Sequence, residues 1–332
     1  MAVLNAYVQT LADYIKKLDP NGQIAPVAEL LNQTNECITD FRWKEGNLPT
    51  GHQVSVRTGL PTVYWRLANQ GIPSSKASSA QIVESCAVLE SQSVVDKLIA
   101  ELGGNLAANR LDEAVAHIEA IGQELASTFF YGAATNPEEF IGLAARYSSL
   151  TAVNGQNVIN AQGSGSDNTS IYLVGWGNNS IYGIYPKGTQ AGLEREDVGL
   201  TTVQTSTTAG AGSLRAYEEW FRWRCGIALK DWRYVVRIAN IDISNLVAKS
   251  SAADLIELMI KAIHRIPNIA SVNPVFYMNR TCFQMLDIAR RDDVVSGGGM
   301  TFENVDGKVQ YSFRGIPIRK CDVLLETEAT VS

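Results

Sequence analysis

The side chains that most often perform catalysis are few and scattered in this sequence. The three histidines, His52, His117 and His264, stand far apart, and none lies in a pattern that predicts a catalytic triad. The nucleophile elbow GxSxG, the zinc-protease motif HExxH and the phosphate-binding motifs GxxxxGK[ST] and GxGxxG are all missing. Acid pairs such as Glu138 and Glu139 are adjacent, so on a helix they would point in different directions. We therefore assign no catalytic, cofactor-binding or metal-binding residue and do not expect an enzyme.

The cysteines also fail to form a recognisable site. They are odd in number, widely spaced and without a CxxC pair: Cys37, Cys86, Cys225, Cys282 and Cys321. A zinc site or a disulfide framework requires closer or paired spacing. We interpret them as buried thiols of a protein in a reducing cytoplasm.

The composition narrows the class of protein. The chain has 332 residues, of which 45% are hydrophobic and 19% charged, with a net charge of −6. A low charged fraction suggests a surface that meets other protein, although a large core would have the same effect. The negative charge argues against a dedicated nucleic-acid binder. No apolar run is long enough to span a membrane.

The N-terminal region predicts two helices. Val3–Leu18 mixes polar residues into an apolar pattern typical of an amphipathic helix, and Asp19-Pro20-Asn21-Gly22 is a strong turn signal. A second helix is predicted from Pro26 to Phe41, because proline is favoured in the first helical turn.

A long hairpin is predicted next. Residues 52–58 alternate Val54 and Val56 with polar residues, 62–68 are rich in β-branched and aromatic residues, and Gly59-Leu60-Pro61 separates the two runs. The small polar stretch 71–79 is predicted to be a mobile loop.

Four residues of this hairpin are candidates for contact with another molecule. Nothing nearby in the sequence covers them, and an extended hairpin with aromatic residues needs a partner surface. A strand pair inside a core sheet would give the same pattern. The candidates are Arg57, Tyr64, Trp65 and Arg66.

The rest of the chain alternates helices and strands. A helical block is predicted over Ser91–Tyr131 with a break at Gly103-Gly104, and its second half carries one apolar stripe. The stripe consists of Leu111, Val115, Ile118, Leu125 and Phe129, with Gly122 in the missing position.

Shorter elements follow, each predicted from its own pattern. A helix is expected after Asn136-Pro137, and two strands, 171–176 and 180–185, are expected to form a hairpin. Residues 154–169 and 201–213 are expected to be loops. Further expected elements are a strand at 234–241, a helix after Ser251, a strand at 275–278, a helix at 280–291, a hairpin at 301–313 and a strand at 316–325. The fold class is α+β.

Three stretches in this order resemble the major capsid proteins of tailed double-stranded DNA bacteriophages, which have the Hong Kong 97-type fold. The resemblance covers about Leu48 to Asp322 and is closest in character to the capsid proteins of short-tailed phages. The stretches are Tyr131-Gly132 followed by Asn136-Pro137-Glu138-Glu139-Phe140-Ile141-Gly142-Leu143-Ala144-Ala145-Arg146-Tyr147, then Ser170–Val174 with Gly183–Gly188, and Phe313–Asp322.

The resemblance implies a domain order. Residues 1–47 would be an N-terminal arm, 48–80 an extended loop and 81–150 a peripheral domain with a long spine helix. Residues 151–300 would be mainly an axial domain with returning peripheral strands, and 301–332 C-terminal peripheral strands.

The resemblance also implies a function. It implies hexamers and pentamers that close into an icosahedral shell around double-stranded DNA, which the shell contacts weakly if at all. The short arm implies a separate scaffolding protein or none, and a cement protein and a portal are further candidate partners. The subunit would assemble in the host cytoplasm and end in the virion capsid. Alternatives are an encapsulin-like compartment that encloses enzymes, a hydrolase whose site lacks a motif, and a tail or portal component.

Overall fold

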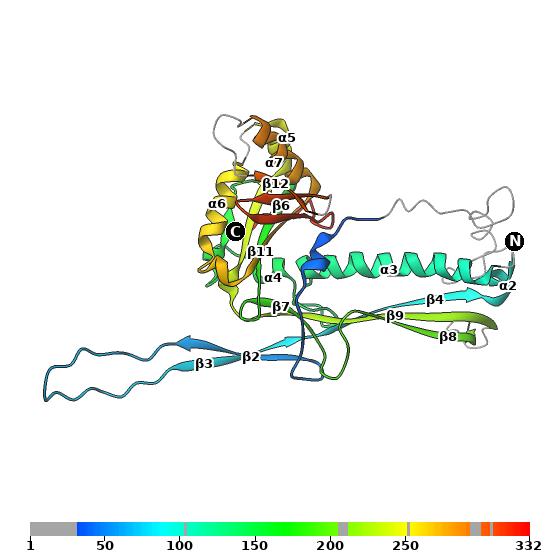
Figure 1. The fold of residues 1–332 in the computed structure, drawn as a ribbon, viewed down its shortest axis with the longest axis horizontal. Coiled ribbons are helices and arrows are strands. Elements are labelled where there is room, and N and C mark those ends of the chain that lie inside the picture. The colour runs from blue at the N-terminus through cyan, green and yellow to red at the C-terminus, as the bar shows by residue number, and fades with distance from the viewer. Residues whose placement is uncertain (1–31, 103–104, 205–211, 251–252, 293–299, 306–307) are drawn as a thin grey trace. The chain divides into compact units, whose positions relative to one another are not determined.

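The computed structural model describes residues 32–102, 105–204, 212–250, 253–292, 300–305 and 308–332 (Figure 1). The helix predicted at Val3–Leu18 lies outside them, as does the start of the one predicted at Pro26–Phe41. The end of that second segment is not an α-helix, because Glu36–Asp40 forms the short 3-10 helix η1. The chain divides into two compact units: unit 1 comprises residues 1–33, 88–125 and 192–224, and unit 2 comprises residues 34–87, 126–191 and 225–332.

Three elements have residues in both units: strand β4 (Ala87–Asp96), helix α3 (Leu106–Tyr131) and strand β9 (Ser213–Leu229). In unit 1, strand β8 (Leu193–Gln204) pairs antiparallel with β9, from Leu193 opposite Trp223 to Gln204 opposite Ser213. The loop predicted at 201–213 therefore begins as a strand, and its centre, 205–211, lies outside the described residues.

Helix prediction in unit 1 was partly wrong. Residues 91–96 belong to β4, where Ser93 and Val95 are buried and their neighbours are more exposed, the two-residue period of a strand. The helical conformation begins only at α2 (Lys97–Ala100), where the Asp96 carboxylate accepts a hydrogen bond from the Leu98 N–H at 2.9 Å.

Helix α3 is confirmed, but only two of the five residues of its predicted apolar stripe are buried. Leu125 and Phe129 are buried, whereas Leu111, Val115 and Ile118 are exposed. In unit 1 the buried face of α3 consists instead of Ala114 and Ile121, which pack with Phe221 of β9.

Unit 2 is built around strand β6 (Asn168–Trp176), every residue of which is buried. It pairs antiparallel with β10 (Val235–Asp242) and β11 (Asn273–Met278). Beyond β11 the sheet continues through β14 (Ile316–Lys320), β13 (Lys308–Phe313) and β12 (Met300–Val305). A strand buried on both faces reads as a continuous apolar run, which is why 171–176 was predictable.

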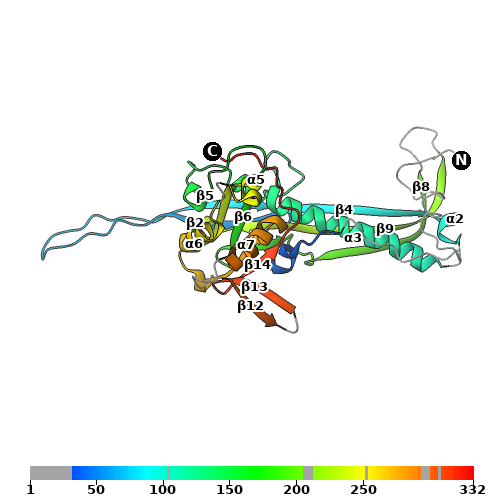
Figure 2. The ribbon, with the colours of Figure 1, turned by 90° about the horizontal axis from the view of Figure 1, so that it is seen from above.

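The two faces of this sheet have different coverings (Figures 1 and 2). Aliphatic side chains of β6, such as Ile171 and Leu173, pack with helices α5 (Ile243–Ala248), α6 (Leu255–Arg265) and α7 (Arg280–Asp292). Aromatic rings fill the other side: Phe129 stacks on Trp176 at 5.8 Å and Phe130 lies 5.3 Å from Tyr172. The end of α3 that belongs to unit 2 therefore closes the core opposite α5–α7.

A buried ion pair joins the C-terminal segment to this core. Arg237 donates to Glu328 at 2.9 Å, and the side chains are 5% and 6% exposed. Glu328 also accepts from Tyr131 Oη and Ser170 Oγ, each at 2.5 Å, while Arg237 donates to the Tyr147 carbonyl at 2.9 Å. Burial, and then the Glu328 charge, raise the pKa of Tyr131, which keeps this phenol protonated as a donor.

Several predicted elements of unit 2 need correction. The hairpin predicted from 171–176 and 180–185 does not form, because β7 (Ile181–Tyr185) pairs parallel with β1 (Trp43–Glu45) and antiparallel with the end of β9. Asn136 caps only a turn, and the helix there is α4 (Leu143–Arg146). The loop predicted at 154–169 contains β5 (Val158–Asn160), which pairs parallel with β10.

Other predicted elements are confirmed by the strands and helices above. They are the strands at 234–241 and 275–278, the helices after Ser251 and at 280–291, and the hairpin of β12 and β13, of which residues 306–307 lie outside the described residues. The strand predicted at 316–325 is confirmed only for Ile316–Lys320. The cap of α6 is Asp254, whose carboxylate accepts from the Glu257 N–H at 3.0 Å. Short 3-10 helices η3 (Gly155–Asn157), η4 (Trp232–Tyr234) and η5 (Ile269–Ser271) complete the unit. No helix among the described residues is long and apolar enough to cross a membrane.

Candidate intersubunit interface

The predicted hairpin is present in unit 2, and it is longer than its sequence pattern indicated. Strand β2 (Gly51–Gly59) pairs antiparallel with β3 (Ser78–Ser85), from Gly51 opposite Ser85 to Gly59 opposite Ser78. Residues 60–77 continue beyond this ladder without regular pairing. Figures 1 and 2 both show this end of the hairpin leaving the strands of unit 2. Below, "the hairpin arm" means residues 57–82.

The turn of the hairpin is not at Gly59-Leu60-Pro61, and residues 62–68 are not a strand. The chain reverses at Leu67–Gln70, where the Gln70 N–H donates to the Leu67 carbonyl at 3.2 Å. Asn69 has a φ of 65°, a conformation that asparagine tolerates better than most residues. The two sides of the arm stay joined through the Ser75 hydroxyl, which donates to the Thr62 carbonyl at 2.7 Å.

The four predicted contact residues all lie exposed on the hairpin arm. Trp65 is fully exposed at 104%, Tyr64 is 48% exposed, and Arg57 and Arg66 are exposed as well. Within the described residues the side chain of neither arginine has a hydrogen bond or an ion pair. Further large apolar side chains exposed on the arm are Leu60, Val63, Leu67, Ile72 and Ile82. Single exposed apolar residues are ordinary, but so many of them along one segment favour an interaction surface.

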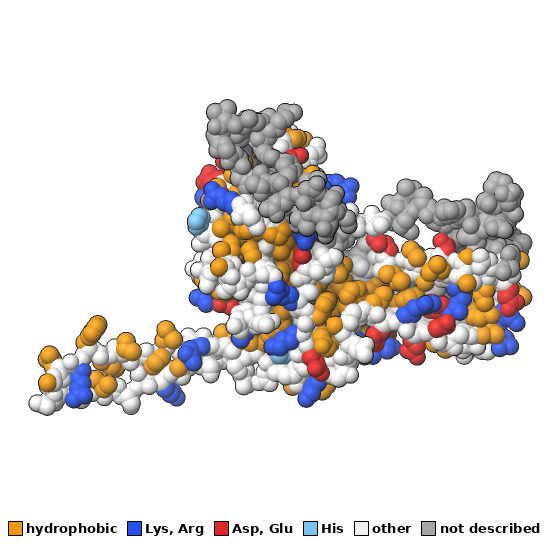
Figure 3. Space-filling model, viewed as in Figure 1, with side chains coloured by type: hydrophobic (Ala, Val, Ile, Leu, Met, Phe, Trp, Pro, Cys, Tyr) orange, Lys and Arg blue, Asp and Glu red, His pale blue; other side chains and the backbone are white. Residues whose placement is uncertain are grey.

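The hairpin arm also has a charge of one sign. It carries Arg57, Arg66 and Lys76, and no acidic residue occurs between Glu45 and Glu84. Figure 3 shows hydrophobic and basic side chains along the arm and no acidic ones on this face. The arm is therefore a basic, apolar surface on a chain whose net charge is −6.

A buried ion pair fixes the base of the hairpin. The guanidinium of Arg146, in α4, donates to both carboxylate oxygens of Glu84 at 2.7 and 2.6 Å, and the Arg146 Nε donates to the Ile141 carbonyl. The side chains are 14% and 8% exposed, and bidentate geometry makes such a pair specific. Sequence reasoning missed both residues. The one available signal was that Glu84 is the first acidic residue after a long stretch without any.

Potential catalytic groups remain separate. His117 lies against the hydroxyl of Ser91, with Nδ1 to Oγ at 2.6 Å, and its ring stacks on Phe221. Among the described residues no carboxylate contacts His117, so the pair lacks the third group that orients a catalytic histidine. His52 and His264 lie elsewhere, in unit 2.

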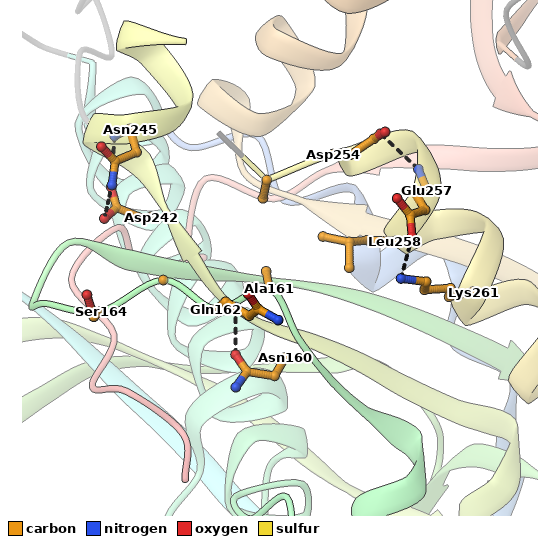
Figure 4. Close-up of a pocket in the computed structure, with 12 residues that line it drawn as sticks. Asn160, Ala161, Gln162, Ser164, Asp242, Asn245, Asp254, Glu257, Leu258 and Lys261 are labelled. Carbon is orange, nitrogen blue, oxygen red and sulfur yellow. Dashed lines mark hydrogen bonds and ion pairs between the residues drawn. The ribbon is translucent and has the colours of Figure 1, made fainter. Parts of the chain in front are cut away.

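A polar cleft of about 520 Å³ in unit 2 collects three carboxylates (Figure 4). Asp242 and Asp254 accept hydrogen bonds from the first turns of α5 and α6, and Glu257 pairs with Lys261 at 2.5 Å. Each acid therefore already has a structural partner. No group of metal-binding side chains occurs among the described residues.

All five cysteines are unpaired thiols. Four are buried, as predicted, and Cys86 is half-buried. Burial raises the pKa of Cys225 and of Cys282 to about 12, so both thiols are protonated and unreactive at neutral pH.

Comparisons with known proteins agree on one family. The family model described as Major capsid protein GP7 matches residues 19–332. A chain of the near-atomic structure of bacteriophage Epsilon15 superimposes with a TM-score of 0.78 and 29% sequence identity, over 100% of this chain and 99% of that chain. No curated protein sequence gives a significant match.

Weaker structural similarities extend to other shells. The capsid of the native GTA particle gives a TM-score of 0.44 at 9% identity, over 68% of this chain and 95% of that chain. The encapsulin complex of Synechococcus elongatus gives 0.43 at 10% identity, over 73% and 97%. Similarity at this level supports no argument about this chain. The family match and the Epsilon15 similarity together assign the chain to the major capsid protein GP7 family, as an α+β structural subunit of the Hong Kong 97 type in an icosahedral phage head.

Proposed function

We propose that the chain assembles into hexamers and pentamers that close into an icosahedral shell around double-stranded DNA, with the hairpin arm as a principal contact between subunits. The observation that carries this proposal is the hairpin arm itself, which is basic, apolar and exposed in the single chain. A surface with these properties is costly in water unless another protein covers it. A closed symmetric shell covers the arm of every copy in the same way.

Within that contact, Trp65 and Tyr64 are the proposed anchors. Aromatic side chains that enter a pocket on a partner dominate binding energy, and they are surrounded by contacts of smaller effect. Arg57 and Arg66 are proposed to pair with acidic side chains of the neighbouring subunit. Such pairs chiefly set the rate and the specificity of association.

The Glu84–Arg146 pair is proposed to hold the arm at a fixed angle to unit 2. A preorganised arm loses less conformational freedom on binding than a mobile one, so the same contacts give a tighter interface. This role accounts for a buried, bidentate ion pair at the base of the hairpin.

The wider organisation is proposed from the resemblance to the family. Residues 1–47 are proposed as the N-terminal arm, which is distinct from the hairpin arm, and 48–80 as the extended loop. Residues 81–150 are proposed as the peripheral domain with α3 as its spine helix, 151–300 mainly as the axial domain with returning peripheral strands, and 301–332 as C-terminal peripheral strands. Assembly in the host cytoplasm with a separate scaffolding protein, and later contact with a cement protein and a portal, belong to the same proposal. The shell is proposed to contact its DNA weakly and to have no catalytic activity, because the net charge is negative and the described carboxylates and histidines form no catalytic set.

The test removes the arm while keeping the ladder that supports it. Gly59 and Ser78 are opposite each other, so residues 60–77 can be replaced by an Asn-Gly turn that closes the hairpin there. We expect a folded subunit that forms no closed shells by sedimentation and electron microscopy, while the unaltered chain does. Closed shells of normal size from the shortened chain would overturn the role of the arm. Nuclease-protected DNA in native particles distinguishes a phage head from a compartment that encloses enzymes.

A further inference from the structure

Helix α3 carries an exposed apolar stripe within unit 1. Leu111, Val115 and Ile118 follow one another at helical spacing, so they share one face. They are 64%, 48% and 43% exposed, whereas Ala114 and Ile121 on the neighbouring face are buried. Figure 3 shows hydrophobic side chains along this helix. Such a face on a helix of a folded protein normally packs against another element.

A segment near the N-terminus of the same chain lies beside the Ile118 end of this stripe. The Gln33 N–H donates to Glu119 Oε1 at 3.2 Å, and Glu119 directly follows Ile118 on α3. The same carboxylate oxygen accepts from the Gln123 side chain at 2.8 Å, which holds it in place. The described part of the chain therefore begins beside the stripe.

The sequence of residues 3–18, which precede this point, has the pattern of an apolar helix face. Apolar residues recur at three- and four-residue spacing, and they would form one stripe of about 21 Å along a helix. The stripe on α3 is about 10 Å long, so the helix is long enough to cover it. These residues are Leu4, Val8, Leu11, Ile15 and Leu18.

The connection and the charges are also compatible with this packing. Fourteen residues lie between Leu18 and Gln33 and could span about 50 Å if extended, so the linker does not restrict placement. The unit 1 part of α3 contains four acidic residues, Asp112, Glu113, Glu119 and Glu124, and one basic residue, Arg110. Lys16 and Lys17, at the end of the predicted helix, have the complementary charge.

We propose that residues 3–18 form an amphipathic helix that packs on the Leu111–Val115–Ile118 stripe of the same chain. The competing occupant is the hairpin arm of a second copy, which is also basic and apolar. The same-chain segment is favoured because its tether at Gln33 gives it a high effective concentration at the stripe. The N-terminal segment thereby becomes a strap along α3. This inference does not depend on the role of the hairpin arm.

Photochemical cross-linking in assembled shells tests which segment lies on the stripe. Val115 is replaced by p-benzoylphenylalanine in a mixture of ¹⁴N- and ¹⁵N-labelled full-length subunits, and the cross-linked peptides are identified by mass spectrometry. The matched control carries the same group in place of Val153, which is 90% exposed in unit 2. We expect links from position 115 to residues 3–18 with both peptides of one label. Links of mixed label, links to residues 57–82, or no link above the control would overturn the proposal.

Hydrogen exchange of the full-length subunit gives a second measurement in case the photoreactive group disturbs folding. In the unaltered chain we expect protected amides in residues 3–18. Val115→Asp should accelerate their exchange about tenfold or more, and Val153→Asp should not. Unprotected amides in the unaltered chain, or equal exchange in the two variants, would overturn the proposal.

Discussion

Unit 2 contains two arginine–aromatic groups that differ in where their partners lie. Arg237 lies 5.7 Å from the ring of Tyr172, is paired with Glu328, and is 4% exposed. Arg66 follows Tyr64 and Trp65 on the hairpin arm, where all three are exposed. The first group is completed by segments of the same chain, whereas the second has a charge and apolar area but no partner within the described residues.

Where the partners lie determines whether a group contributes to the stability of the subunit or to the association of subunits. A side chain whose partners belong to its own chain contributes to folding, so its loss should be detected in an isolated subunit. A side chain whose partners belong to another subunit does not stabilise the isolated subunit, so its loss should be detected only on assembly. The predictions below ask whether the two groups separate in this way.

The largest effect is expected at the buried pair. Arg237→Met leaves the Glu328 carboxylate buried without its cation, which should lower the free energy of unfolding by about 3–5 kcal/mol. Removing both charges, as in Arg237→Met with Glu328→Met, should recover most of this loss because no charge is left unpaired. Denaturant unfolding of the soluble subunit measures both.

Arg233→Met is the matched control, because Arg233 pairs with Asp231 at the surface. It should change the free energy of unfolding by about 0–1 kcal/mol. Equal losses for Arg233→Met and Arg237→Met would mean that burial does not determine the strength of these pairs.

At the hairpin arm, the next largest effect should fall on assembly alone. Trp65→Ala should leave the unfolding free energy of the subunit within about 0.5 kcal/mol. It should weaken each contact between subunits by about 2 kcal/mol or more, which raises the subunit concentration needed for shells. Light scattering against subunit concentration measures that threshold, with Val153→Ala as control. A destabilised subunit that forms shells at the normal concentration would mean that Trp65, like Arg237, has its partners within its own chain.

Charge reversal on the arm should have a smaller effect that depends on salt. Arg57→Glu with Arg66→Glu should slow assembly by about tenfold or more at low salt, because complementary charges accelerate encounter. Added salt screens these charges and should reduce the difference in assembly rate between the variant and the unaltered chain. Stopped-flow scattering at several salt concentrations measures the rates. A gap that does not change with salt would mean that the arginines act through packing.

The smallest effect is expected at His52, at the base of the hairpin. Its Nδ1 accepts from the Asn47 N–H at 3.2 Å, and burial, then the charges of Lys44 and Lys230, lower its pKa below the usual 6.5. Since the unfolded chain binds the proton more readily, stability should fall as the pH drops below about 6.5. His52→Gln should lose less stability than the unaltered chain between about pH 7.5 and pH 5.5 in thermal unfolding. Equal changes in thermal stability with pH for His52→Gln and the unaltered chain would contradict this role for His52.

Sequence patterns predicted the elements whose environment is uniform along their length. Strand β6 is buried throughout, and its residues 171–176 form an almost continuous apolar run, while α7 has a single apolar face, so local patterns were sufficient. Ser91–Asp96 was predicted to be helical because it lacks a clear alternation of polar and apolar residues and is followed directly by residues that favour a helix. The pairing of β7 with β1 could not be predicted, because strand order depends on contacts between segments more than a hundred residues apart.

The hairpin arm was recognised from residue types, but its dimensions were not. Gly59 and Pro61 are strong turn formers, yet the reversal lies at Asn69, because exposed segments need not use every turn signal they contain. Its anchor was missed, since Glu84 and Arg146 are 62 residues apart and meet only through tertiary structure. Local sequence therefore indicated an exposed arm, and only the fold identified what holds it.

The contacts of unit 2 also set an order of events during folding. Tyr131 meets Glu328 across 197 residues of chain, and Thr34 meets Asp322 across 288, whereas β2 and β3 are near neighbours in sequence. Long-range contacts form slowly and local ones quickly. The adhesive hairpin would thus exist before the sheet that supports it is complete. Newly made subunits are most prone to aggregate in that interval, and aggregation rises with their concentration, so weaker expression, which keeps fewer incomplete subunits present at once, should raise the yield of soluble chain.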